Sequence, residues 1–159
     1  MRVHILTISD RAARGEYEDL SGAEIEALLR EAFPGAELSR RIISDDPEGI
    51  RAALEEACAG ANAPDFILTT GGTGISPRDT TPEVTAAFCE KELPGIAEAL
   101  RAASLAETST AMLSRAYAGM RGKTLIVNFP GSVRACRLCV SVLIPVMEHV
   151  AAMASGEGH

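Results

Sequence analysis

The sequence contains no tryptophan, and aromatic residues make up only 4% of its 159 residues. Its core must therefore be built mostly from alanine, leucine, isoleucine and valine, within a hydrophobic fraction of 47%. Positive charge is also scarce, because 15 lysines and arginines stand against 22 acidic residues, which gives a net charge of −7. That balance argues against a nucleic-acid-binding surface, although a local site on an acidic protein can still bind an anion.

Long apolar runs and a cysteine framework are missing as well. No apolar run approaches the roughly 20 residues needed to span a bilayer, so we expect no membrane partner. Residues 3–8 already have the pattern of a strand, which leaves no room for a signal peptide. We therefore expect a cytoplasmic protein with its four cysteines reduced, folded as a single domain over residues 1–159.

Apolar strands alternate with amphipathic helices along the chain. Strands are expected at residues 3–8, 37–43, 65–70 and 124–128, and the second is less apolar and so nearer a sheet edge. The last helix, about residues 134–154, is apolar around much of its surface and is expected to be well buried, with a kink or break near Pro145. The alternation predicts a three-layer α/β/α sandwich with a mostly parallel sheet.

Two helix starts have capping signals. Ser21 with Glu24 has the spacing of a capping box, which begins a helix after an exposed, solvated stretch that includes residues 16–19. Asp46 followed by Pro47 predicts the start of the next helix, with Asp46 as the N-cap. This assignment leaves Asp45 free at the end of the second strand.

The most informative stretch is residues 69–83, Thr-Thr-Gly-Gly-Thr-Gly-Ile-Ser-Pro-Arg-Asp-Thr-Thr-Pro-Glu. It connects a buried strand to a helix start, and Gly71, Gly72 and Gly74 allow positive φ and close backbone approach. Successive free N–H groups near a helix N-terminus bind anions, phosphate above all. A plain tight turn needs the same glycines, but the threonine, serine, arginine and Asp79 around them favour a ligand site.

Polar residues follow every strand of the predicted sheet, and parallel strands bring their C-terminal ends to one edge. The four exits are Ser9-Asp10, Asp45, the Gly71 loop and residues 128–132. Each aspartate alone is typical of a capping or turn residue. Together, however, Asp45 and Asp79 can hold a hard cation through oxygen ligands, as Mg²⁺ is held on a nucleotide.

In their order along residues 3–150, these motifs resemble those of the molybdenum-cofactor biosynthesis family of MoaB/Mog type. The motifs are Ile8-Ser9-Asp10, the Asp45-Asp46 turn, residues 70–83, Leu113-Ser114-Arg115 and Asn128-Phe129-Pro130-Gly131. The branch that adenylylates molybdopterin is the most similar. The resemblance implies a molybdopterin-binding-like fold and a Mg²⁺-dependent transfer of AMP from ATP to the terminal phosphate of molybdopterin, with release of pyrophosphate.

The resemblance also implies roles for individual residues. Asp45 and Asp79 would be the catalytic pair and would hold Mg²⁺. The nucleotide and its phosphates are expected at Ser9, Asp10, Gly71, Gly72, Thr73 and Gly74. The pterin is expected at Ser114, Arg115, Asn128, Pro130, Gly131 and Ser132, with Arg115 as the partner of its negative charge. Family members are typically homotrimers, sometimes hexamers, and a molybdenum-insertion protein is an implied downstream partner.

Two departures from the family pattern leave alternatives open. The adenylylating branch often has Pro-Asp-Glu where this chain has Ser44-Asp45-Asp46, so either aspartate can be the metal ligand, and the capping argument favours Asp45. Residues 130–137 are more similar to a sister branch, some of whose members bind the pterin without adenylylating it. The alternative is therefore a molybdopterin-binding carrier or regulatory paralogue. A phosphate-ester hydrolase ranks third, because no serine has an evident histidine partner.

Overall fold

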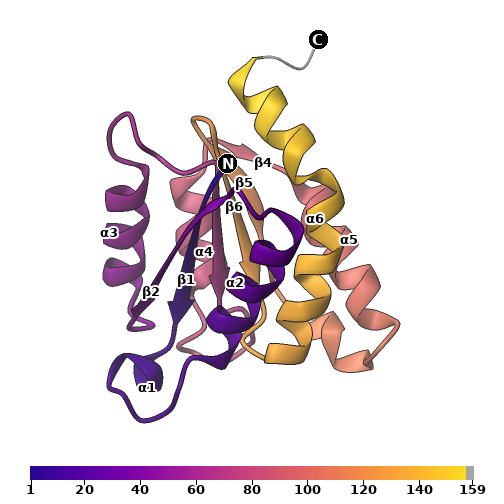
Figure 1. Ribbon diagram of the computed structural model, residues 1–159. Helices are drawn as coiled ribbons and strands as arrows, with labels where there is room; N and C mark the ends of the chain where they lie inside the picture. The colour runs from indigo at the N-terminus through magenta and orange to yellow at the C-terminus, as the bar shows by residue number, and fades with distance from the viewer. Residues whose placement is uncertain (157–159) are drawn as a thin grey trace.

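The computed structural model describes residues 1–156 and contains a six-stranded sheet with helices on both faces (Figure 1). The strand order is β2 (Glu37–Ile43), β1 (Arg2–Ile8), β3 (Phe66–Thr70), β6 (Thr124–Phe129), β5 (Ala118–Arg121) and β4 (Lys91–Glu92). The first four in this order are parallel, β5 pairs with β6 in antiparallel fashion, and β4 pairs with β5 in antiparallel fashion. The predicted α/β sandwich with a mostly parallel sheet is confirmed. The single-domain prediction for residues 1–159 stays a prediction, and its last three residues lie outside the described range.

The central strands are buried because helices cover both faces, and alternate residues feed two separate cores. Phe66 and Leu68 of β3 face the core that receives α2 (Leu20–Ala32), α5 (Pro94–Leu105) and α6 (Val133–Ser155). Ile67, between them, faces the second core, which receives α3 (Pro47–Cys58) and α4 (Thr81–Phe88). β2 lies at an edge and is mostly exposed, as its lower apolar content predicted.

The register of the parallel strands determines where the site lies. Ile8 at the end of β1 pairs with Ile43 at the end of β2, and Thr70 at the end of β3 pairs with Thr7 and with Phe129 at the end of β6. The chain therefore leaves all four parallel strands at one edge of the sheet. The short elements α1 (Asp10–Ala13) and η1 (Ser109–Leu113) complete the chain order.

Two predictions for the first half of the chain are wrong. The N-cap of α2 is Asp19, whose carboxylate accepts a 2.8 Å hydrogen bond from the N–H of Gly22, and Ser21 lies inside the helix. Asp19 was expected in a solvated stretch but is only 7% exposed, because its carboxylate also accepts the hydroxyl of Thr7 at 2.8 Å. The local capping-box spacing is thus overridden by a contact with the sheet.

Strands β4 and β5 were not predicted. β5 covers Ala118–Arg121, just before the predicted strand at residues 124–128, and its register pairs Arg121 with Thr124 of β6. β4 has only two residues, both charged and exposed, so it carries no apolar signal. A strand of this length is defined by its partner rather than by its own sequence.

Helix α6 differs from expectation in its burial. It is 23 residues long, and an 18-residue window has a mean hydropathy of 1.7, so by length and composition it could span a membrane, contrary to the sequence-based expectation. One stripe, which includes Cys136, Leu143 and Met147, packs against the core, but only 22% of the window is buried, and Val146 and Met153 are exposed. The prediction that it is well buried is therefore wrong. A core helix of a globular protein has the same length and hydropathy, and α6 packs one stripe against the core. The length and hydropathy are therefore only weak evidence that α6 spans a membrane. The helix continues through Pro145.

Candidate functional site

The glycine-rich loop begins where β3 ends, and two of its glycines are required by geometry. Gly71 has φ +105° and Gly72 has φ +66°, values that residues with a side chain rarely adopt. A Cβ on Gly71 would lie 2.3 Å from the carbonyl oxygen of Ile8, and one on Gly72 would lie 2.2 Å from the hydroxyl of Thr81. Gly74 does not have a positive φ; a Cβ there would lie 2.9 Å from the Asp79 carboxylate. The loop therefore runs tightly between β1 and the start of α4.

Side chains hold the loop in this shape. The Asp79 carboxylate accepts the N–H of Ser76 at 2.8 Å through Oδ2. The Arg115 guanidinium donates through Nε to the carbonyl of Gly74 at 2.7 Å, and it also contacts the Asp79 carbonyl and the Glu83 carboxylate. Arg115 thus binds the loop in this structure, and its pairing with an anionic pterin stays a prediction.

A pocket of about 400 Å³ opens beside this loop. It brings four of the six residues predicted to bind the nucleotide and its phosphates together with four of the six predicted to bind the pterin. Its lining consists of Gly71, Gly72, Thr73, Gly74, Asp79, Thr110, Leu113, Ser114, Pro130, Gly131 and Ser132. A smaller pocket of about 190 Å³ shares Thr110, Ser114, Pro130 and Ser132 with it and extends to Arg101. Thr110 was not predicted as a site residue, and no pattern in the short helix η1 marks it.

Three residues form a charged cluster next to the loop. Asp10 begins α1 and accepts through Oδ1 from the Ser44 hydroxyl and from the N–H of Asp45 at 3.2 Å. Arg78, from the glycine-rich loop, donates through Nη2 to Oδ2 of Asp10 and to Oδ1 of Asp45, the latter at 2.6 Å. Asp10, predicted to bind the nucleotide, is therefore already paired with a cation. Arg78 lies in the motif that carried the prediction but was not itself assigned a role.

The environment of Asp45 favours a cation. Burial and then the negative charge of Asp79 raise the pKa of the Asp45 carboxyl, which indicates that the two carboxylates lie near each other. The direct contact with the Arg78 guanidinium at 2.6 Å favours the ionised carboxylate and so acts in the opposite sense. Asp46 is the N-cap of α3 and accepts from Glu48 and Gly49, as predicted, so the two neighbouring aspartates have different partners.

The fit of these residues to Mg²⁺ can be judged from the donors. Among residues 1–156, no group of three or more His, Cys, Asp or Glu side chains is placed to hold a metal ion. Mg²⁺ commonly binds through one or two carboxylates together with waters and substrate phosphates, so a complete protein cage is not required. Asp45 and Asp79 fit that mode, and the Arg78 guanidinium already provides a positive charge beside Asp45.

Ser9 and Asn128 line neither pocket. The Ser9 hydroxyl caps α1 by accepting the N–H of Ala12 at 3.3 Å and contacts the Tyr17 hydroxyl at 2.9 Å. Asn128, predicted to contact the pterin, is fully buried, and its amide donates to the hydroxyls of Thr69 and Thr85 at 3.0 Å each. Asn128 therefore joins β3, β6 and α4 beneath the loop. The predicted direct contact between Asn128 and the pterin is wrong, because the side chain is buried.

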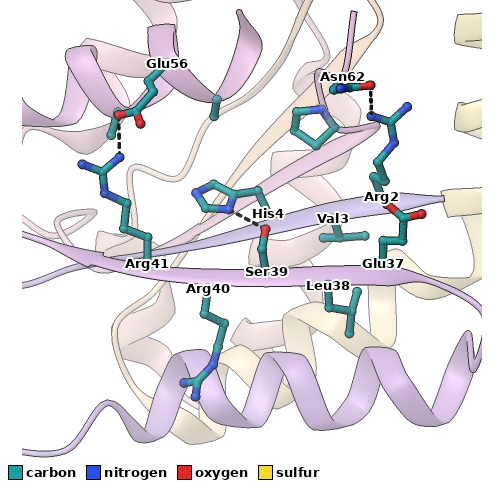
Figure 2. Close-up of a pocket in the computed structure, with 13 residues that line it drawn as sticks. Arg2, Val3, His4, Glu37, Leu38, Ser39, Arg40, Arg41, Glu56 and Asn62 are labelled. Atoms are coloured by element: carbon teal, nitrogen blue, oxygen red, sulfur yellow. Dashed lines mark hydrogen bonds and ion pairs between the residues drawn. The ribbon is translucent and has the colours of Figure 1, made fainter.

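A larger cavity of about 600 Å³ lies at the other end of β1 and β2 (Figure 2). Several of its side chains bond one another: Arg41 pairs with Glu56 at 2.7 Å, and the His4 imidazole contacts the Ser39 hydroxyl at 2.9 Å. Burial, then the charge of Arg41, lower the pKa of His4, so its neutral form is favoured. Because ligands of open α/β sheets bind at the carboxyl ends of the strands, the glycine-loop edge is the better candidate despite its smaller volume.

The protein is thus an α/β domain with a candidate ligand pocket at the carboxyl edge of a mainly parallel sheet. The family model described as a probable molybdopterin binding domain matches residues 4–149, so the chain belongs to that family. This confirms the family predicted from the motifs.

Relatives and solved structures agree with this assignment. The chain is 40% identical to a molybdopterin adenylyltransferase of Helicobacter pylori (strain J99), over 94% of this chain and 85% of the relative. It is 39% identical to the molybdenum cofactor biosynthesis bifunctional protein of Chlorobaculum tepidum, over 99% of this chain and 50% of that protein. The crystal structure of the molybdopterin biosynthesis enzyme MoaB from Thermus thermophilus matches with a TM-score of 0.85 at 40% identity, over 98% of this chain and 96% of its own.

Proposed function

We propose that the protein is a molybdopterin adenylyltransferase of molybdenum cofactor biosynthesis. A terminal phosphate oxygen of molybdopterin attacks the α-phosphorus of ATP, the bond between the α- and β-phosphates breaks, and pyrophosphate leaves. The observation that carries the proposal is one pocket lined both by the glycine-rich loop with Asp79 and by Ser114 and Pro130. The name and high coverage of the Helicobacter pylori relative support the same activity.

The proposed mechanism depends on positioning and on neutralising charge. The backbone of residues 71–74 lines the pocket and is suited to bind phosphate oxygens. Asp45 and Asp79 would hold Mg²⁺, which when bound supplies positive charge to the phosphates of ATP. The contacts of Arg115 with Gly74 and Asp79 keep the loop in one shape, so the phosphate-binding groups are in place before the nucleotide arrives.

The assembly and cellular setting belong to the proposal as well. We infer a homotrimer or hexamer, by resemblance to the family, and the exposed apolar side chains of Leu105, Val146 and Met153 are available for such contacts. The four cysteines are all free thiols, which supports a cytoplasmic location. This chain spans half of a bifunctional relative, which supports a molybdenum-insertion protein as the partner that receives the product.

The test is turnover of molybdopterin with ATP and Mg²⁺, with detection of pyrophosphate and of the adenylylated pterin. Asp79→Asn removes the charge at nearly constant shape and is expected to lower turnover about 100-fold or more while the pterin still binds. Asp45→Asn should behave similarly. Asp46→Asn is the matched control, because an asparagine still caps α3, and it should keep most of the activity.

The second candidate is a molybdopterin carrier or regulatory paralogue, which residues 130–137 favour by their resemblance to the sister branch. Tight pterin binding without pyrophosphate release in the presence of ATP and Mg²⁺ would establish this function instead. Equal loss of turnover in Asp46→Asn and Asp45→Asn would contradict the assignment of Asp45 as the metal ligand.

A further inference from the structure

Arg78 occupies the position that a bound cation would take between two carboxylates. A single nitrogen, Nη2, contacts Asp10 and Asp45 together, and these three residues come from the start of α1, the end of β2 and the glycine-rich loop. The side chains of Asp10 and Asp45 are 14% and 23% exposed, whereas that of Arg78 is 64% exposed. The two carboxylates are therefore mostly buried, and the guanidinium lies between them and solvent.

The cluster needs a cation because its negative charges outnumber the positive charges near them. Asp10 and Asp45 are joined by an N–H···O bond of 3.2 Å, and Asp79 acts electrostatically on Asp45. Arg14 reaches Asp10 only at 4.0 Å, and its side chain is 58% exposed, so Arg78 is the main countercharge. Like charges at this spacing repel each other unless a cation lies between them.

The two sides of this ion pair are held unequally. Asp10 is fixed by the Ser44 hydroxyl and the backbone of Asp45. Within residues 1–156, the Arg78 guanidinium has only its contacts with Asp10 and Asp45. An ion pair made by an exposed side chain contributes little net stability, so Arg78 can leave at little cost while the carboxylates stay in place.

We propose that Arg78 competes with the divalent metal for Asp45, so that the metal binds tightly only when nucleotide phosphate draws the guanidinium away. Arg78 is then a positioning residue, and this inference rests on the proposed function. A guanidinium can bind phosphate through two parallel hydrogen bonds, so the nucleotide offers it a two-point contact in place of the single-nitrogen contact with Asp10 and Asp45. The exchange couples metal and nucleotide binding, and the coupling must be equal in both directions.

The test measures Mn²⁺, as a probe for Mg²⁺, by electron paramagnetic resonance of the free ion. Wild type, Arg78→Ala and Arg78→Lys are titrated with and without a non-hydrolysable ATP analogue. Without nucleotide, Arg78→Ala is expected to bind Mn²⁺ about tenfold more tightly than wild type, and the gain in affinity on adding the analogue should shrink by a similar factor. Arg78→Lys, which keeps the charge but not the planar fork, should lie between the two.

The matched control is Arg51→Ala, which removes the same charge from an exposed ion pair with Glu55 on α3. It should change Mn²⁺ affinity less than twofold, which separates competition at the site from the change in net charge. Thermal melting verifies that each variant is folded. A purely structural role for Arg78 would weaken Mn²⁺ binding in Arg78→Ala, so equal or weaker binding than in Arg51→Ala overturns the inference.

The outcomes also separate this inference from the proposed function. If wild type binds Mn²⁺ with the analogue but Arg78→Ala shows no gain without it, only the role of Arg78 is wrong. If no variant binds Mn²⁺ under any condition, both this inference and the proposed metal site are wrong. If Arg78→Ala gains affinity but wild type forms no adenylylated pterin, the competition stands and the transferase proposal fails.

Discussion

Gly71 offers the sharpest test of how the loop is built, because the structure separates two costs of replacing it by alanine. Its φ of +105° costs a residue with a Cβ about 1–2 kcal/mol. Its Cβ would also lie 2.3 Å from the carbonyl oxygen of Ile8, and this oxygen belongs to the backbone of a buried strand. Real Cβ atoms essentially never approach closer than 3.0 Å, so one of the two backbones must shift.

Gly60 provides the control for Gly71, since its φ is +77° and a Cβ there would meet nothing within 4 Å. Gly60→Ala therefore has only the backbone cost, whereas Gly71→Ala adds the cost of overpacking, about 1–3 kcal/mol. In a domain of this size, 1 kcal/mol changes Tm by about 2–4 °C, so Gly71→Ala should melt about 2–12 °C below Gly60→Ala. Circular dichroism melts of both variants measure the difference. Melting points within about 1 °C of each other would refute the reasoning from the Ile8 contact.

Three further predictions concern the fold around the site. Asp19→Ala removes the α2 cap and leaves the buried Thr7 hydroxyl without its acceptor. Urea unfolding should show that the free energy of unfolding falls by about 2–4 kcal/mol, against about 1 kcal/mol for the exposed cap in Asp46→Ala. Equal losses in the two variants would contradict this reasoning. Burial raises the pKa of all four thiols, to about 11 for Cys89 and Cys136 and to about 12 for Cys139. The native protein should therefore react slowly with a thiol reagent at pH 8, and four equivalents should react only after unfolding. Because the pKa of His4 is lowered in the folded protein, the unfolded chain binds this proton more readily, and the protein loses stability as the pH falls below about 6.5. The Tm of His4→Gln should therefore fall less than that of wild type between pH 7 and pH 5.

The sequence was sufficient to predict the parts of the fold that have strong local signals. The four parallel strands lie within one residue of their predicted ends, because each is an apolar or alternating run bounded by turn residues. Strand β4 has only Lys91 and Glu92, so nothing in its own residues distinguishes it from a loop. The N-cap of α2 was misassigned because Asp19 is selected by the Thr7 hydroxyl of β1, a contact that no local spacing contains.

The same distinction applies to the candidate site. Gly71, Gly72 and Asp79 could be assigned from the sequence because they act within one contiguous loop whose backbone requires them. Arginine side chains could not be assigned in this way, since their partners depend on how separate segments meet. The contacts of Arg115 are with the loop, and its predicted contact with the ligand stays a prediction. Arg78 bridges to Asp10, which lies 68 positions away.

Two acidic residues of the candidate site, Asp79 and Asp10, share one structural feature that prepares the site for a ligand. Asp79 uses Oδ2 to accept the N–H of Ser76, and Asp10 uses Oδ1 to accept the N–H of Asp45. Each carboxylate is thus oriented by the backbone through one oxygen, and the other oxygen remains available to a cation or, for Asp10, to Arg78. Because this ordering occurs on folding, the proposed nucleotide would not have to impose it on binding, and preorganised charge is usually the largest contribution to catalysis of phosphoryl transfer. A substitution that keeps the carboxylate but disturbs its backbone partner should therefore reduce turnover more than it reduces ligand affinity.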